Sequence, residues 1–93
     1  MINNTEFLPT SEEDIKEESF EAYLRTHFKI IKNTDDTLPF ERFIKWRKHI
    51  GTVLTKDELQ IIYEIVNKSL DNCNLLTFIL LNQIIDENDG ARF

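Results

Sequence analysis

Two glycines and two prolines are all that this 93-residue chain contains of the residues that most often interrupt helices. Apolar residues recur at spacings of three and four, which is the period of an amphipathic helix. Few helix breakers and this period favour long helices joined by short polar connections. A chain of this length forms one domain, and it is too short for a dinucleotide-binding fold or a barrel enzyme. We therefore predict an all-α fold of four helices.

The first two helices have recognisable start and stop signals. Thr10 and Glu13 form a capping box, in which side chains satisfy the free backbone N–H groups of a helix start. We therefore expect the first helix over residues 11–29. Pro39 suits the first position of the second helix, because its missing N–H would go unpaired there anyway. Gly51 is the expected stop at the C-terminus of that helix.

The last two helices have similar signals. Thr55 and Glu58 form a second capping box at the start of the third helix, and Asn74 can cap the fourth. The stretch from Asp86 onward is acidic and then irregular, so we expect the fourth helix to end near that residue. The apolar residues expected on the buried face of the fourth helix are Leu76, Ile79, Leu80 and Ile84.

These helices divide the chain into two helix–loop–helix units of similar length. We expect the units over residues 11–50 and 55–87, as a duplication with a repeat of about 38 residues. Residues 1–10 show no periodicity and are expected to form a flexible N-terminal tail. Residues 88–93 are expected to form a C-terminal tail.

Composition and charge disfavour several classes of protein. The single cysteine cannot form a disulfide framework or a multi-cysteine metal site, which favours a reducing compartment. A formal net charge of -6 disfavours nucleic acid and anionic lipid as partners. No apolar run reaches the ~18 residues of a membrane span, and no signal peptide is visible. We expect a cytoplasmic protein that binds neither nucleic acid nor membrane.

Residues that could carry catalysis are few. His27 and His49 have no partner at catalytic spacing, and Asp71 lies close enough in the sequence to raise the pKa of Cys73. The chain has no glycine-rich loop that could bind phosphate. We therefore predict that the protein is not an enzyme and has no cofactor. Trp46 lies in a basic second helix, whose charge we expect to balance the acids at the start of the first helix.

The segment from Leu38 to Asn67 resembles the EF-hand family, in particular its calmodulin and essential myosin light chain members. Residues 51–60, GTVLTKDELQ, match the family's linker and the start of its next helix without a gap. At each loop exit, an apolar residue in a β-like conformation is expected to precede two core residues. These residues are Leu38, Phe40 and Phe43 in the first unit and Leu76, Phe78 and Leu81 in the second. The resemblance covers residues 12–87 and implies a pair of EF-hand-like helix–loop–helix units.

The two loops depart from the family's calcium site. An EF-hand loop has about 12 residues, with a glycine at its sharp turn and a bidentate glutamate at its end. Here the loops are expected over residues 29–42 and 67–80, and Arg42 and Leu80 occupy the glutamate position. Neither loop contains glycine. We therefore predict that neither loop binds calcium or another metal.

The resemblance also implies a groove that receives an amphipathic helix of a larger protein. We predict a calcium-independent, single-lobe adaptor whose acidic rim favours a basic partner helix, such as the IQ-type motif of a myosin neck. The groove residues carried over by position are Phe28, Phe43, Trp46, Ile50, Ile62, Leu81, Ile84 and Ile85. The rim residues are Glu17, Glu64, Asp86 and Glu87. The alternative is that a compact core absorbs these apolar side chains, which leaves no exposed patch.

Two other functions stay open at this point. Residues 20–28, FEAYLRTHF, are similar to the opening of the all-helical, matrix-facing subunit of mitochondrial cytochrome c oxidase. That similarity implies a structural subunit of a large assembly with a mitochondrial location. A symmetric homodimer would instead bury the apolar surface against a second copy of the chain.

Overall fold

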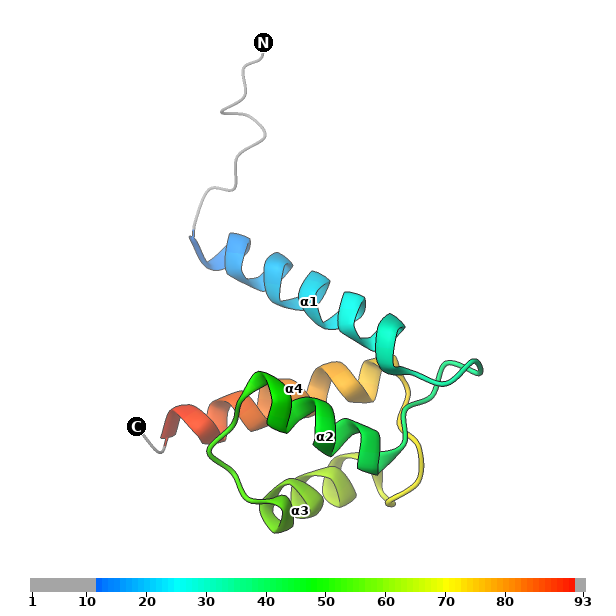
Figure 1. Ribbon diagram of the computed structural model, residues 1–93. Coiled ribbons are helices and arrows are strands. Elements are labelled where there is room, and N and C mark those ends of the chain that lie inside the picture. Colours follow the sequence, from blue (N-terminus) through cyan, green and yellow to red (C-terminus); the bar gives the residue numbers. More distant parts are fainter. Residues whose placement is uncertain (1–11, 92–93) are drawn as a thin grey trace.

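The computed structural model describes the backbone of residues 12–91 and the side chains from Phe20 onward (Figure 1). The described range contains helices and no strand, which confirms the all-α prediction. The helices are α1 (Glu12–Ile31), α2 (Phe40–Ile50), α3 (Lys56–Asn67) and α4 (Leu75–Ala91). Each begins within a residue or two of its predicted start.

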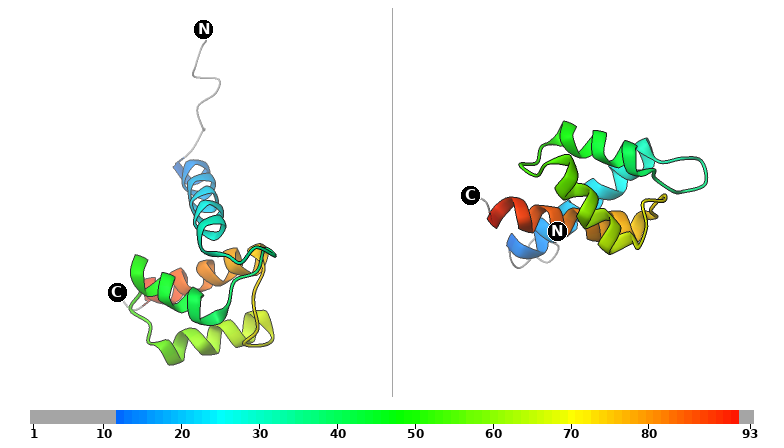
Figure 2. Two further views of the ribbon diagram at one scale, coloured as in Figure 1. Left: turned by 45° about the vertical axis from the view of Figure 1, so that its right-hand side comes forward. Right: turned by 90° about the horizontal axis from the view of Figure 1, so that it is seen from below.

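The helix α4 occupies the centre of the arrangement. It lies between α1 and α3 and packs against both, while α2 packs against α3 (Figure 1). The α1–α2 loop and the α3–α4 loop lie side by side at one end of the molecule (Figures 1 and 2). From that end α1 diverges from α2, so that its N-terminal half projects beyond the other three helices.

Aromatic side chains from all four helices meet in the core. The ring of Phe43 in α2 lies 5.6 Å from that of Tyr63 in α3 and 5.9 Å from that of Phe78 in α4, between centroids. The Phe78 ring also lies 5.2 Å from Phe28 of α1 and 4.9 Å from Trp46 of α2. Each such pair stabilises the fold by ~0.5–1.5 kcal/mol beyond the burial of its area. One aromatic cluster therefore joins both units into a single domain.

Local signals for helix ends are confirmed at three positions. Gly51 has φ 111°, a conformation that glycine tolerates best, and its N–H donates back into the last turn of α2. The capping box of Thr55 and Glu58 is formed, with N–O distances of 2.9 and 3.2 Å. Asn74 Oδ1 accepts a hydrogen bond from Thr77 N at 2.9 Å at the start of α4.

The two remaining start signals have different outcomes. Pro39 is the N-cap of α2, with extended backbone angles, and the helix begins one residue after it. The predicted capping box of Thr10 and Glu13 lies outside the described residues, as does the predicted tail over residues 1–10.

The buried face of α4 differs from the prediction. Phe78, Leu81 and Ile85 are fully buried, whereas Leu76 is 73% exposed and Leu80 is 47% exposed. The other two residues of the predicted stripe are only partly buried. The first three turns of α4 are apolar on almost every side, so spacing alone is compatible with more than one buried face. Contacts with the other helices select the face that carries Phe78.

Arg47 of α2 is buried and joins α2 to α4. Its guanidinium donates to Asn82 Oδ1 at 2.7 Å, to an Asp86 carboxylate oxygen, and to Asp89 Oδ2 at 3.2 Å. A buried charge is strongly destabilising unless it has such partners. The described partners of this basic residue therefore lie on α4, whereas the acids expected to balance α2 lie in residues 12–18, whose side chains are not described.

Asp89 explains why α4 continues further than predicted. We expected residues 88–93 to form a tail, but α4 remains helical through Ala91. Asp89 Oδ1 accepts hydrogen bonds from Thr52 Oγ1 at 2.8 Å and from Val53 N at 3.0 Å. These bonds attach the last turns of α4 to the linker between α2 and α3. Partners so distant in sequence leave no local pattern that could predict them.

The starts of the helices give no single offset between the two helix–loop–helix units. Leu38 forms an isolated antiparallel bridge with Cys73, and α2 and α4 begin at residues 40 and 75, so both pairs are 35 residues apart. The starts of α1 and α3, at residues 12 and 56, are 44 residues apart, so the repeat of about 38 residues stays a prediction. Cys73 takes the bridge position that we had assigned to Leu76. Because α4 has so many apolar residues, Leu76 and Phe78 have the same spacing as Leu38 and Phe40, although Leu76 lies inside a helix.

Removing the Asp89 carboxylate should weaken the fold. Asp89→Ala leaves Thr52 and Val53 without their acceptor and reduces the partners of buried Arg47, so we expect a loss of about 2 kcal/mol in the free energy of unfolding. Urea unfolding followed by circular dichroism measures this loss. The matched control is Glu87→Ala, an exposed acid two residues away, which should change stability by less than about 0.5 kcal/mol. Equal effects of the two substitutions would contradict the role given to Asp89.

Candidate functional site

An arginine closes the loop between α1 and α2. Arg42, in the first turn of α2, donates from Nη1 to Ile31 O at 2.9 Å and to Asn33 Oδ1 at 2.8 Å. The guanidinium thus places a positive charge against loop oxygens, which is what a bound cation does in a calcium loop. Because arginine stays protonated in proteins, this charge is permanent.

Other polar atoms of the same loop bind one another. Asn33 N donates to Thr37 O at 2.7 Å, and Thr37 Oγ1 donates to Asp35 Oδ1 at 2.5 Å. Lys32 Nζ lies 2.9 Å from Asp36 Oδ1. Asp36 has φ 65°, a left-handed conformation that aspartate tolerates better than most residues. The loop therefore turns sharply without glycine and uses several of its oxygens internally.

The loop between α3 and α4 is also bound within itself. Asn67 Nδ2 donates to Asp71 O at 2.9 Å, and Asp71 N donates to Ser69 Oγ at 3.1 Å. Lys68 ends α3 in the left-handed conformation, with φ 69°. An amide donor thus reaches across this loop from Asn67, the last residue of α3, which occupies the first ligand position of the predicted calcium-type loop.

The connections between the helices of each unit cover residues 32–39 and 68–74. All four ends of the predicted calcium-type loops lie inside helices, namely Lys29, Arg42, Asn67 and Leu80. Within the described part of the chain, no group of three His, Cys, Asp or Glu side chains is arranged to hold a metal ion. That the chain binds no metal stays a prediction for experiment.

Leu38 and Cys73 join the two loops through their backbones. Leu38 N donates to Cys73 O at 2.8 Å, and Cys73 N donates to Leu38 O at 2.9 Å. The Tyr63 hydroxyl of α3 lies 2.6 Å from Asp71 O and 3.3 Å from Leu38 O. Burial raises the pKa of Tyr63, so the hydroxyl keeps its proton for donation to these carbonyls. Tyr63 therefore links α3 to both loops.

Cys73 is poorly suited to covalent chemistry. Its side chain is buried, and this burial raises the pKa of the thiol to about 11. A thiol that keeps its proton is a weak nucleophile. The predicted direction of this pKa shift is confirmed, but its cause is burial and not the neighbouring Asp71.

The predicted groove residues come together mainly as a packed interior. Five of the eight are at most 7% exposed, namely Phe28, Phe43, Trp46, Leu81 and Ile85. The other three, Ile50, Ile62 and Ile84, are partly buried. The sequence thus identified side chains that lie close together, but they pack in the core and do not line an open groove in this conformation. An open groove at these residues requires the helices to separate.

Four exposed apolar side chains lie elsewhere, on α3 and α4, in addition to Tyr23, Ile30, Val53 and Leu70. Ile61 and Ile65 are 56% and 65% exposed on α3, and Leu76 and Leu80 lie one turn apart on the exposed side of α4. These two helices pack against each other. Sequence reasoning placed the two leucines in the core and therefore missed their exposure. The sequence could have indicated this exposure, because α4 has more apolar residues than one buried face can hold.

Charge is distributed unevenly over the described residues. Residues 25–49, which include the end of α1 and all of α2, contain seven Lys and Arg and three acids. Residues 50–91, which include α3 and α4, contain two Lys and seven acids. Ile61, Ile65 and Leu80 therefore belong to the acidic segment of the sequence, whereas Leu76 lies in a pocket with Arg25, Lys29 and Lys32.

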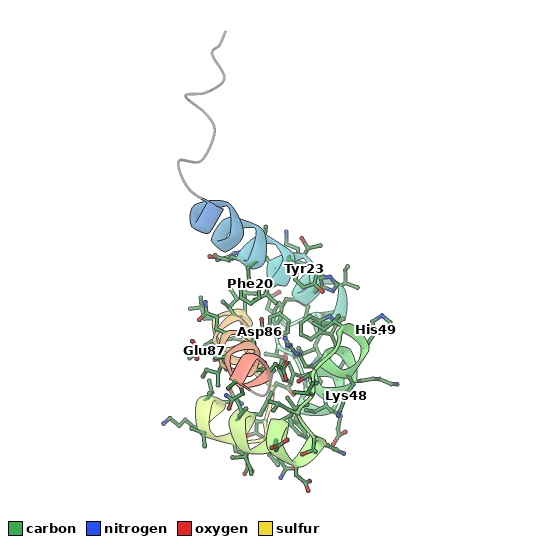
Figure 3. All side chains as sticks on the ribbon, turned by 90° about the vertical axis from the view of Figure 1, so that its left-hand side faces the viewer. Phe20, Tyr23, Lys48, His49, Asp86 and Glu87 are labelled. Carbon is green, nitrogen blue, oxygen red and sulfur yellow. The ribbon has the colours of Figure 1, made fainter. Side chains whose placement is uncertain are left out.

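The four predicted rim acids have different environments. Glu64 of α3 and Glu87 of α4 are exposed, whereas Asp86 pairs with Arg47. Figure 3 shows Asp86 and Glu87 on α4, away from Lys48 and His49 on α2. The side chain of Glu17 lies outside the described residues.

The basic second helix does not present its tryptophan to a ligand. Trp46 is buried, and its Nε1 donates to His27 Nδ1 of α1 at 3.0 Å. The His27 ring in turn lies 4.2 Å from that of Tyr23. These contacts give His27 and Trp46 a structural role between α1 and α2, and His49 is exposed about one turn further along α2.

No family model, no curated protein and no solved structure matches this chain. None of the helices that the structure describes is long and apolar enough to cross a membrane. Function is therefore inferred from the contacts, burial and charge of the chain's own residues.

Exchanging Arg42 for glutamate should create a weak calcium site. The substitution removes the guanidinium from Ile31 O and Asn33 Oδ1 and supplies a carboxylate in the same loop as Asp35. Calorimetric titration with calcium should give no saturable binding to the unchanged chain and a dissociation constant of about 1 mM or tighter for Arg42→Glu. The control Arg42→Gln loses the charge without gaining a carboxylate and should not bind. Micromolar binding by the unchanged chain would contradict this interpretation of the loop.

Proposed function

We propose that this protein is a calcium-independent adaptor of EF-hand type that binds a basic amphipathic helix of a larger protein. The observation that carries the proposal is the position of Arg42. Its guanidinium supplies the loop with a permanent cation, held at 2.9 Å from Ile31 O and 2.8 Å from Asn33 Oδ1. A lobe with this loop does not need calcium to complete it, so its partner would be bound constitutively.

Three further features support the EF-hand character of the proposal. The chain has two helix–loop–helix units, and their loops are joined by the antiparallel bridge of Leu38 and Cys73. The linker from Gly51 to the capping box at Thr55 has the form that the family resemblance implies. Asp36 adopts a positive φ in the first loop, and an EF-hand loop has glycine at its sharp turn.

The partner's surface is assigned to the outer faces of α3 and α4. Ile61, Ile65 and Leu80 are exposed there. The eight-residue groove is the less favoured surface, because using it would expose five side chains that already pack in the core. Burying side chains that are already exposed contributes favourable binding free energy. Opening a packed core first would consume part of that free energy.

The charge of this surface favours a basic partner. Exposed Glu64 lies next to Ile65 in the sequence of α3, and exposed Glu87 lies two turns beyond Leu80 on α4. A helix with apolar residues on one face and Lys or Arg beside them would complement both features. An IQ-type motif of a myosin heavy chain is one helix of this chemistry.

Polar substitutions on this surface should weaken binding of such a helix. Ile65→Ser and Leu80→Ser each remove an exposed apolar contact, so we expect the dissociation constant of a labelled IQ-type peptide to rise about tenfold for each. Fluorescence anisotropy in the presence of a chelator measures the affinity, and circular dichroism should show unchanged helicity. The matched control is Ile30→Ser, because Ile30 is also exposed, at 73%, but lies in the basic segment of residues 25–49.

Three outcomes would contradict parts of this proposal. Unchanged peptide affinity in Ile65→Ser and Leu80→Ser would move the binding site elsewhere. Peptide binding that requires calcium would contradict the adaptor's calcium independence. Peptide-free protein that sediments as a dimer, with Ile65→Ser restoring the monomer, would assign the same surface to a second copy of the chain.

A further inference from the structure

A pocket of about 550 Å³ lies between the C-terminal end of α1 and the N-terminal end of α4. The two helix ends lie next to each other in Figures 1 and 2. Leu76 of this pocket lies one turn before Leu80 on α4, so the pocket adjoins the surface to which the partner helix is assigned, but its other lining residues are different. Its volume is in the range of pockets that hold small organic molecules, about 300–1,000 Å³.

The interior of this pocket is apolar. Phe28 of α1 is buried at its base, and Leu75 and Leu76 of α4 line its other side. Leu76 is 73% exposed, the highest value among the large apolar side chains together with Ile30. An apolar chain placed between Phe28 and Leu76 would cover this side chain and gain the free energy of its burial.

The rim of this pocket is basic. Arg25 and Lys29 lie one turn apart on α1, Lys32 follows directly after the end of that helix, and all three line the pocket. The only acid among the lining residues is Asp36, which pairs with Lys32 at 2.9 Å. Arg25 pairs with Glu21 at 2.7 Å, outside the pocket. Lys29 is exposed, and no acid is paired with it in the described part of the chain.

We propose that this pocket binds a small amphipathic anion, a molecule with an unbranched apolar chain and a carboxylate head group. The chain would lie against Phe28, Leu75 and Leu76, and the carboxylate would face Lys29. The mainly apolar lining with a few cations at one side is the arrangement by which pockets orient such ligands. A partner helix would need a long groove, whereas this pocket is confined to the junction of two helix ends.

Three probes separate the contributions of chain and charge. Decanoate carries both, acetate carries the carboxylate alone, and decyltrimethylammonium carries the chain with the opposite charge. Two-dimensional NMR of the full chain, below the micelle concentration of each probe, should give saturable shifts with decanoate. The shifts should be largest at Phe28, Lys29 and Leu76. Acetate and the ammonium compound should bind at least tenfold more weakly.

Variants of two exposed residues test the location. Leu76→Ser and Lys29→Glu should each raise the dissociation constant of decanoate at least fivefold, whereas Lys29→Arg should retain binding. Both positions are exposed, so the amide spectrum of each variant should show a folded chain. The control is Lys45→Glu, an equal charge change on α2 that lies outside the pocket.

Each of the other results overturns the proposal. Absence of saturable shifts with decanoate would exclude the ligand class. Equal binding of decanoate and decyltrimethylammonium would indicate a general affinity for detergents without recognition of charge. Decanoate binding that Leu76→Ser and Lys29→Glu leave unchanged would place the ligand outside this pocket.

Discussion

The two backbone hydrogen bonds between Leu38 and Cys73 hold the loops side by side, and the placement of all four helices depends on them. Each loop joins two helices, so loops that are fixed to each other fix four helix ends. The Tyr63 hydroxyl reaches Leu38 O and Asp71 O and ties α3 to the same point. From this end, the aromatic cluster around Phe43 and Phe78 fills the space between the helices.

At the opposite end of α4, buried Arg47 and Asp89 attach this helix to α2 and to the α2–α3 linker. Asp89 accepts from the α2–α3 linker as well as from Arg47, so the end of α4 and the linker are fixed together. Arg42 completes the first loop with a charge that belongs to the chain itself. A calcium sensor changes the angle between its helices when the ion binds. A loop that already contains a cation has no such signal to respond to, and our proposal of constitutive binding rests on this contact.

The parts of this structure that the sequence predicts are those with local causes. Gly51, the capping box at Thr55 and the cap at Asn74 act within a few residues, and all three are confirmed. Leu76 and Leu80 were placed wrongly because α4 is apolar on most sides, and only tertiary contacts choose its buried face. The same ambiguity gave Leu76 the β-like position that Cys73 occupies. At the candidate site, the sequence showed that Arg42 stands where a calcium loop has its glutamate. It could not show that Arg42 donates to Ile31 O and Asn33 Oδ1, because these contacts depend on how α1 and α2 pack.

Amide hydrogen exchange at Leu38 and Cys73, measured in a chelator and again with added calcium, tests the central claim most directly. Both N–H groups lie in the bridge between the loops, so their protection reports whether the loops are paired. We predict that both exchange slowly in the chelator, at rates close to those of the core of α4, and that calcium changes neither rate. Fast exchange in the chelator that slows on adding calcium would contradict a lobe completed by its own arginine.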